Sequence, residues 1–442
     1  MTVSDAPARQ DKPSLSADKA ASVRGRGFQT LQRLPLPAIC GGIFLLALVV
    51  RIGLAVALNL HATPRNTEFE RIALTLAATG VFGDPYRIPT GPTAHHAPLY
   101  PLVLSWLYSL FGMGANGRLA QVLFNSGAAS LQYALLPVAA AMGQLKRHIG
   151  ILAGLVGALV PLHLLIEINS MESLAGVALI GLFLLTLRTW QAEPSWRAAL
   201  MHGLGWGLAL LLTPALLPVF VALSLAGYFL AGKRASWFQH TLLTCCWAAV
   251  TLVPWTARNY VQFDALFFVR NNLGLELSVS NNDFARAAID DNEKSGAYRN
   301  HPFSNQAEAE RVKEMGEIAY HREKMQEAQR WIKAHPLRFA RLTALRLFYF
   351  WFPKTTRPAQ TILLWTLTVL SGAGLWQLFR INRAMAWGIA LIWVSFPLAY
   401  YLLQASARYR FPIHWTFLLL AALATGNFLA EINVRNRWNI RL

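Results

Sequence analysis

The chain has 442 residues, of which 55% are hydrophobic and only 14% are charged. Soluble domains carry about 25% charged residues, so this composition excludes a soluble globular enzyme and favours a protein that lies largely in a membrane. The formal net charge of +18 could attract nucleic acid, but the basic residues gather in the N-terminal tail, the short loops and the C-terminal tail. That distribution is the positive-inside pattern of a multi-spanning membrane protein, so we expect no nucleic-acid partner.

A segment that crosses a bilayer as a helix needs about 20 predominantly apolar residues. Ten segments of the chain meet or approach this requirement. They are 36–60, 117–143, 149–166, 171–190, 199–213, 215–232, 238–257, 360–379, 385–403 and 409–430. We therefore predict an all-α polytopic membrane protein, a bundle of about ten transmembrane helices with two long loop regions on its outer face.

The predicted spans divide the chain into successive parts. These are a polar tail (1–35), an N-terminal membrane region (36–257) that contains the first outer loop (61–116), a second outer segment (258–359), C-terminal spans (360–430) and a basic tail (431–442). Ten crossings return the chain to its starting side, and the loop charges agree with this count. We expect both tails in the cytoplasm and the protein in a bacterial inner membrane.

The stretch 337–353 is an eleventh candidate span within the second outer segment. Its arginines, Arg338, Arg341 and Arg346, recur at helical spacing. Charged side chains along an otherwise apolar helix are typical of a helix that lies in the membrane interface. Spanning and interfacial arrangements both stay open, and the charges favour the interfacial one.

The first outer loop carries two carboxylates, Glu68 and Glu70, soon after the first span. Thr67 can cap a short helix that runs from Glu68 to Thr79 and ends at Gly80. Glu68 then lies in the first turn, near the positive end of the helix dipole, where a carboxylate stays ionised. An ionised carboxylate suits a base that accepts a proton from a hydroxyl, although an ordinary first-turn acid has the same pattern.

A path rich in proline and glycine follows this helix and contains the pair His95 and His96. Each proline fixes its backbone φ, so the path is predicted to be rigid and non-helical. The two histidines could donate to a phosphate or a hydroxyl, hold the loop, or bind a metal. Adjacent side chains are expected to point apart, and no third ligand is evident nearby, which disfavours a metal. The sequence implies no cofactor firmly and leaves the role of a divalent ion open.

A cation stands at the outer end of the predicted span 238–257. Arg258 follows that span directly, within the motif Pro-Trp-Thr-Ala-Arg-Asn-Tyr at 254–260. Positive charge on the outer side runs against the positive-inside bias. Two interpretations stay open: the side chain snorkels to the interface, or it clamps a lipid-linked phosphate, which a guanidinium matches with two parallel hydrogen bonds.

Charged residues also occur inside or beside the predicted spans. Arg51 lies within the first span, and Glu167 and Glu172 flank a predicted turn between two later ones. Buried charges in a membrane are costly and usually paired, so a structural pair between Arg51 and a glutamate and a contact with substrate are both open interpretations. Arg408 opens the last span, again on the outer side.

These motifs, in this order, resemble the GT-C glycosyltransferases, the superfamily that includes protein O-mannosyltransferases and lipid A aminoarabinose transferases. The likeness rests on an acid shortly before Ile-Ala in the first outer loop, Pro-Leu-Tyr-Pro at 98–101, Pro-Trp-x-x-Arg-Asn-Tyr at 254–260 and Ser-x-Arg-Tyr-Arg-x-Pro at 406–412. It implies transfer of a sugar from a polyprenyl-phosphate carrier to an envelope glycan, lipid or protein on the outer face, with inversion. One departure is Ala97, where aminoarabinose transferases carry a lysine.

The resemblance also implies roles for individual residues. Glu68 would be the catalytic base, and Glu70 is the less favoured acid. The residues expected to bind the donor phosphate are Arg258, Arg408, His95 and His96, and the secondary contributors are Glu172, Asn259 and Tyr100. The implied partners are the lipid-linked sugar donor, the envelope acceptor and membrane lipid.

Two other classes of function stay open. A lipid or solute transporter of the envelope would place broken helices at mid-membrane and show repeat symmetry, and no internal repeat is evident. A catalytically silent assembly factor would keep the fold without needing Glu68. The polar motifs gather on one predicted face, which favours the glycosyltransferase.

Overall fold

The computed structural model describes residues 34–62, 65–193, 195–230 and 234–439 of the chain. Helices dominate these ranges, which contain two isolated β-bridges and no β-strand. The predicted all-α class is therefore confirmed. Within the same ranges, five helical segments are long and apolar enough to cross a membrane. They are Leu36–Ala57, Ala115–Met142, Glu172–Gln191, Pro358–Ile381 and Arg383–Leu402.

The described helices include one for each of the ten predicted spans. In chain order these are α2 (Leu36–Ala57), α5 (Ala115–Ala134) with α6 (Leu136–Met142), α7 (Arg147–Leu159), α9 (Glu172–Gln191), α10 (Trp196–Leu212), α11 (Leu217–Leu230), α12 (Arg234–Phe263), α18 (Pro358–Ile381), α19 (Arg383–Ser395) and α22 (His414–Asn439). Some are shorter than predicted: α7 ends before Pro161, and a separate helix, α8 (Leu164–Asn169), follows it. The polytopic membrane architecture is confirmed, whereas the number of crossings stays a prediction.

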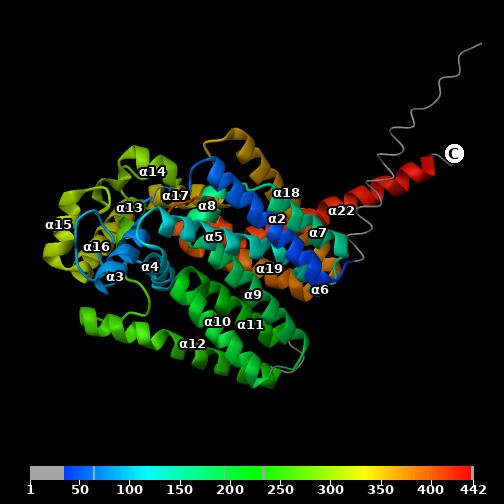
Figure 1. Ribbon diagram of the computed structural model, residues 1–442, viewed down its shortest axis with the longest axis horizontal. Helices are drawn as coiled ribbons and strands as arrows, with labels where there is room; N and C mark the ends of the chain where they lie inside the picture. Colours follow the sequence, from blue (N-terminus) through cyan, green and yellow to red (C-terminus); the bar gives the residue numbers. More distant parts are fainter. Residues whose placement is uncertain (1–33, 63–64, 194, 231–233, 440–442) are drawn as a thin grey trace, which may run out of the picture.

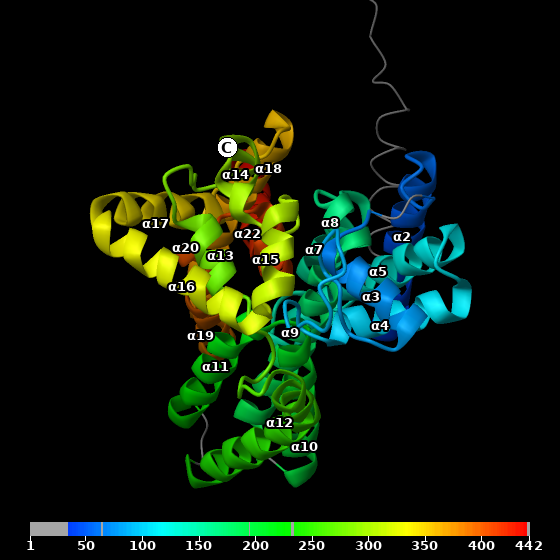
Figure 2. The same cartoon turned by 90° about the vertical axis from the view of Figure 1, so that its left-hand side faces the viewer.

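The two long polar regions fold into a set of helices called here the outer layer. Its helices are α3 (Glu68–Thr79) and α4 (Leu99–Phe111) from the first region, and α13 (Leu273–Ser280), α14 (Ile289–Ser295), η2 (Ala297–Asn300), α15 (Gln306–Met315), α16 (Glu317–Ala334) and α17 (Pro336–Trp351) from the second. In Figure 1, α3 and α13–α16 lie at one end of the molecule, and the end of α22 lies at the other. Figure 2, viewed from the first end, shows α3 with α4, α13 with α15 and α16, and α10 with α12 as three neighbouring sectors.

The core of the bundle is an apolar cluster shared by helices from both halves of the sequence. Phe183, Trp206 and Trp415 are buried in it. α18 and α22 pack so closely that a Cβ added to Gly374 would lie 2.0 Å from the Leu420 carbonyl oxygen. Small residues at helix crossings allow this approach in membranes. The bundle is thus a closely packed base for the outer layer.

Arg51 is paired inside the bundle. Its Nη2 lies 3.1 Å from Glu167 Oε1 and donates to the Gly157 carbonyl oxygen at 2.8 Å. The Tyr133 hydroxyl donates to the same Glu167 oxygen at 2.6 Å. Because the two charged side chains are 0% and 1% exposed, they compensate each other away from any ligand. Of the two interpretations of Arg51, the structural pair is the one observed, and its partner is Glu167 rather than Glu172.

The three arginines of α17 do not share one interfacial face. Arg338 is partly exposed and Arg341 is exposed, whereas Arg346 is fully buried. The Arg346 guanidinium donates to Asn281 Oδ1 at 3.0 Å and to the Leu402 carbonyl oxygen at 2.9 Å. Arg346 therefore gives no support to an interfacial helix, since residues at the ends of α13 and α20 (Leu398–Leu402) satisfy it inside the protein.

Candidate active site

Glu68 and Glu70 have different surroundings in the first turn of α3. Glu70 is buried, and its carboxylate accepts the Thr67 N–H at 3.2 Å and a Gln121 Nε2–H at 3.0 Å, with Arg118 3.6 Å away. The Thr67 contact is the reach of a capping-box acid back to the start of α3, and the three contacts together occupy the carboxylate. Glu68 keeps 21% of its side chain exposed and lines a cavity. Glu70 is therefore engaged within the fold, and Glu68 is the one of the two that faces the cavity.

Three histidines surround the Glu68 carboxylate. His95 Nε2 lies 3.3 Å from Oε1, His96 Nε2 lies 3.2 Å from Oε2, and His301 Nε2 lies 3.7 Å from Oε1. The rings of His95 and His96 meet edge to face, with centroids 4.9 Å apart. The expectation that adjacent histidines point apart is wrong here, because the irregular backbone of this loop brings both rings to one carboxylate. His301, which follows η2, was not predicted, and nothing in its local sequence connects it with Glu68.

The loop that carries the histidine pair is held by side chains from two helices, α16 and α12. Glu317, the first residue of α16, is buried and accepts hydrogen bonds from the Thr93 hydroxyl and, at 2.7 Å, from the Ala94 N–H. From α12, Arg258 donates to the Thr93 carbonyl oxygen at 2.9 Å and to the Phe82 carbonyl oxygen at 3.1 Å. Buried backbone groups require such partners, so these contacts fix the path of the loop.

The Arg258 side chain is thus occupied by hydrogen bonds within the protein. Its guanidinium also lies over the Trp255 ring, 4.8 Å from the centroid, and it is not among the described residues that line the cavity. The expected contact with a donor phosphate is therefore replaced by a loop-holding role. Two secondary candidates are structural as well. Asn259 is buried and accepts from Arg258 at 3.1 Å, and the buried Tyr100 hydroxyl accepts from Asn125 Nδ2 at 2.7 Å.

A cavity of about 1380 Å³ lies beside the Glu68 cluster. Its polar part is lined by Glu68, His96, Glu172, Arg270, Glu276 and Arg408, among others. Apolar residues of α10, α11, α12 and the segment after α12 line another part of the cavity, called here the apolar branch; they include Leu210, Leu217, Leu252, Leu266, Phe267 and Phe268. A pocket with one charged end and one apolar branch suits an amphipathic ligand with a charged head and a hydrocarbon tail.

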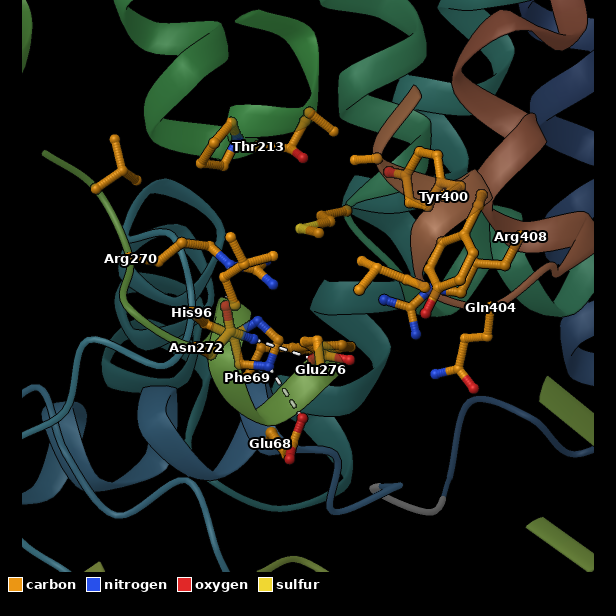
Figure 3. A pocket seen from close by; sticks show the side chains of 18 of the residues that line it. Glu68, Phe69, His96, Thr213, Arg270, Asn272, Glu276, Tyr400, Gln404 and Arg408 are labelled. Atoms are coloured by element: carbon orange, nitrogen blue, oxygen red, sulfur yellow. Dashed lines mark hydrogen bonds and ion pairs between the residues drawn. The ribbon is translucent and has the colours of Figure 1, made fainter. Parts of the chain in front are cut away.

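Two arginines face the cavity from opposite sides (Figure 3). Arg408 Nε donates to Glu172 Oε1 at 2.5 Å, and Arg270 Nε donates to Asn272 Oδ1 at 2.6 Å. In the described part of the chain, no hydrogen bond engages the Nη groups of either arginine. Arg270 directly follows the apolar run 266–269, so it stands where the apolar branch meets the Glu68 cluster. Arg270 was not among the predicted site residues, although a cation directly after an apolar run is a signal that the sequence carries.

The electrostatics of the cluster favour one ion pair. Burial raises the pKa of Glu68, but the charge of His95 and the hydrogen bond from His96 outweigh burial and hold this pKa well below its usual range. Burial lowers the pKa of His95, and the Glu68 charge more than offsets it, so this pKa is raised. Burial lowers the pKa of His96 to about 4 and also lowers the pKa of His301. At neutral pH an ionised Glu68 therefore lies beside two neutral histidines, His96 and His301, and its charge favours the protonated form of His95.

Comparison with known proteins identifies the fold. No family model matches the chain, and no curated protein is significantly similar to it in sequence. A solved structure of the archaeal oligosaccharyltransferase AglB from Archaeoglobus fulgidus, in complex with an inhibitory peptide and a dolichol-phosphate, is similar over 92% of this chain with a TM-score of 0.53 and 15% sequence identity. The chain shares its fold with AglB, a glycosyltransferase of the GT-C superfamily.

Two further structures of the Archaeoglobus fulgidus oligosaccharyltransferase agree with this GT-C match. One, tethered with an acceptor peptide containing the NVT sequon, is similar over 90% of this chain, with a TM-score of 0.53 and 15% identity. The other, a complex with Zn and sulfate, is also similar over 90%, with a TM-score of 0.51 and 16% identity. The chain spans about half the length of these proteins, 52%, 50% and 50% respectively.

The GT-C resemblance read from the motifs is thus confirmed at the level of the fold. Of the residues that it singled out, Glu68, His95 and His96 come together in one cluster. Arg408 and Glu172 form an ion pair that lines the same cavity. The GT-C fold therefore gathers residues from the first outer loop and from the start of the last span around one space.

Proposed function

We propose that this protein is a membrane glycosyltransferase that uses a lipid-phosphate-linked sugar donor. One observation carries the proposal: a single cavity joins an apolar branch, two arginines with unengaged Nη groups and the ionised Glu68 carboxylate. The apolar branch suits a polyprenyl chain, the arginines suit its phosphate, and the carboxylate suits an acceptor hydroxyl. The GT-C fold supports the same reaction class.

Arg270 and Arg408 would bind the donor phosphate. A guanidinium offers paired N–H groups that match phosphate oxygens. Both side chains are already oriented through Nε, to Asn272 and Glu172, so their Nη groups need little reorganisation when the donor binds. His96 lines the cavity and is a further candidate for the phosphate.

His95 has a different place in the proposal. Its side chain is fully buried and does not belong to the described cavity lining. We therefore assign it the orientation of Glu68 rather than the phosphate contact expected from the sequence. The two side chains favour each other's charged forms, since the pKa of Glu68 is lowered and the pKa of His95 is raised by their contact.

The transfer would proceed by direct displacement at the anomeric carbon of the sugar. The acceptor hydroxyl oxygen forms a bond to that carbon, the bond from the carbon to the phosphate oxygen breaks, and the phosphate leaves with the electron pair. Glu68 accepts the hydroxyl proton, and its position at the cavity surface places it to do so. Arg270 and Arg408 stabilise the charge that develops on the leaving phosphate. A single displacement inverts the anomeric configuration.

The partners and the membrane location complete the proposal. AglB was solved with a dolichol-phosphate, and the related structure carries an acceptor peptide, which supports a lipid-phosphate carrier and a separate acceptor for this chain. We place the reaction on the outer face of a bacterial inner membrane, with an envelope glycan, lipid or protein as acceptor. The basic tails and short loops support cytoplasmic termini, with the segments 61–116 and 258–359 outside.

The test uses the purified full chain in lipid nanodiscs with a panel of synthetic polyprenyl-phosphate hexoses and pentoses. Envelope extract supplies the acceptor, and mass spectrometry follows both the lipid and the glycosylated product. We expect released polyprenyl phosphate and a new glycoside in equal amounts, and neither from the Glu68→Gln variant. In sealed vesicles, movement of an intact lipid-linked sugar across the bilayer without a new glycoside would contradict the proposal and support a transporter.

A further inference from the structure

The Glu68 cluster has the spacing of a metal-binding site. Glu68, His95 and His96 each offer one ligand atom, and these atoms lie within 4.8 Å of one another. His301 adds a fourth group on the same carboxylate. The distances from the histidine nitrogens to the carboxylate oxygens are 3.2, 3.3 and 3.7 Å. Two ligand atoms that each lie about 2.1 Å from a tetrahedral ion are roughly 3.4 Å apart, so the cluster already has coordination spacing.

Two buried atoms of the cluster lack a hydrogen-bond partner within the described residues: His95 Nε2 and Glu68 Oε1. They lie 3.3 Å apart without the geometry of a hydrogen bond. The two atoms face each other as an ion pair at this distance, and an ion bound between them would satisfy both. The other ring nitrogen of His95, Nδ1, lies 3.3 Å from the Tyr86 hydroxyl. Such an outer contact is typical of an imidazole whose remaining nitrogen binds a metal.

We propose that Glu68, His95, His96 and His301 bind one divalent transition-metal ion, for which Zn²⁺ is the best match. Imidazole nitrogens with one carboxylate oxygen suit Zn²⁺, whereas Mg²⁺ and Ca²⁺ prefer oxygen ligands throughout. The contacts of Glu317 with the histidine loop hold two of the ligands in place before any ion arrives. The site is therefore preorganised by the fold.

The metal site does not rest on the proposed transfer reaction. One oxygen of Glu68 is enough to bind the ion, and the other stays available to an acceptor hydroxyl. Glu68 and His96 both line the cavity, so the site is continuous with the space proposed for the substrates. Metal binding and sugar transfer can thus be measured separately on the same protein.

The experiment titrates Co²⁺ and Zn²⁺ separately into the full chain after it has been stripped with a chelator. Co²⁺ should produce visible absorption bands of tetrahedral intensity, and Zn²⁺ should abolish them by displacement. We expect one ion per chain at saturation by elemental mass spectrometry. Glu68→Gln, His96→Asn and His301→Asn should each weaken Zn²⁺ binding by more than about tenfold, and Tyr86→Phe should weaken it by about tenfold.

His335→Asn is the matched control, because His335 is an exposed histidine of the segment 258–359, which also contains His301. It should leave Zn²⁺ affinity unchanged, and size-exclusion elution establishes that each variant is folded. Equal affinity in the parent and in a Glu68→Gln, His96→Asn double variant would overturn the metal site, as would a parent that shows no saturable binding. A protein that binds the ion but transfers no sugar would contradict the proposed function and leave the metal site standing.

Discussion

The carboxylate of Glu317 accepts the backbone N–H of Ala94 at 2.7 Å, across 223 positions of sequence. The same carboxylate also accepts the Thr93 hydroxyl. One buried side chain of α16 thereby holds the loop whose histidines surround Glu68. The second outer segment does more than cover the cavity, because it fixes the geometry of the first outer loop.

Glu317→Ala should destabilise the protein and disturb the site together. It leaves the buried Ala94 N–H without a partner, which costs about 1–3 kcal/mol of unfolding free energy. Thermal unfolding in detergent and the transfer rate should both fall. Glu314→Ala, an exposed acid on the preceding helix, is the control and should change neither. A Glu317→Ala protein with parental stability and rate would show that the loop is held by other contacts.

Substitutions at Glu68 and Glu70 should separate chemistry from stability. Glu68→Gln removes a proton acceptor while preserving shape, so the transfer rate should fall by about 10²–10⁴-fold. The unfolding free energy should change by no more than about 1 kcal/mol, the size of a first-turn charge effect. Glu70→Gln should instead lower the unfolding free energy and leave the transfer rate of the folded protein nearly unchanged, because Glu70 is buried beside Arg118 and accepts the Thr67 N–H. Its expected cost is about 1–3 kcal/mol.

Initial rates with the lipid-linked donor and melting curves of the same samples decide between these outcomes. Glu68→Asp should keep part of the activity, since the carboxylate is retained. Equal losses of activity at Glu68 and Glu70 would argue against a distinct chemical role for Glu68.

Arg270 and Arg258 should respond differently to truncation. A charge-assisted hydrogen bond contributes about 1.5–3 kcal/mol, so Arg270→Ala should lower kcat/KM for the donor by roughly 10- to 100-fold at little cost in stability. Arg270→Lys should recover only part of this, because an ammonium cannot reproduce the guanidinium fork. Arg258→Ala should mainly lower the Tm, since Arg258 bonds to the carbonyl oxygens of Thr93 and Phe82.

Kinetics across a range of donor concentrations test this assignment. Arg330→Ala, an exposed arginine of α16, should match the parent. A larger loss of donor use in Arg258→Ala than in Arg270→Ala, at equal stability, would return the phosphate role to Arg258.

Glu308 should make the stability of α15 and α16 sensitive to acid. Its carboxylate accepts the Tyr320 hydroxyl at 2.6 Å and lies 3.1 Å from Lys324 Nζ. Burial raises the pKa of Glu308, but these hydrogen bonds and the Lys324 charge outweigh burial and place it below the ordinary value of 4.5. Because the pKa is lower in the folded state, the stabilisation is present above the unfolded pKa and is lost as pH falls through the folded one.

Circular dichroism melts at about pH 6 and at successively lower pH provide the measurement, since the stabilisation is lost as pH falls below the unfolded pKa of Glu308 and through its lower folded pKa. The parent should lose more stability between these pH values than Glu308→Gln, which should already be weaker at the higher pH. Identical pH dependence in both proteins would refute the contribution of Glu308.

Much of the fold follows from hydropathy, and its failures have local causes. The ten apolar segments can be recognised in the sequence because a helix that faces lipid consists almost entirely of apolar side chains. Their lengths depend on breaks such as the one before Pro161, where α7 ends early. The burial of Arg346 could not be predicted, because its acceptors come from α13 and α20, which are distant in sequence.

The candidate site was predictable where its chemistry is local. Glu68 was found from its helix-start position and the motif around it. The convergence of His95 and His96 depends on an irregular loop that only long-range contacts hold in place. His301 and Arg270 come from the second outer segment, and their roles depend on how that segment packs against the first.

The pairing of Arg51 with Glu167 has a consequence for biogenesis. Glu167 follows Arg51 by 116 positions, so the ribosome delivers α2 long before the anion that neutralises it. An unpaired arginine at the centre of a membrane helix costs about 2.5–3.5 kcal/mol on insertion. We expect α2 to remain beside the translocation machinery until α8 emerges, rather than to diffuse alone into lipid. An ion pair of the finished bundle thus sets the order in which its first helices leave that machinery.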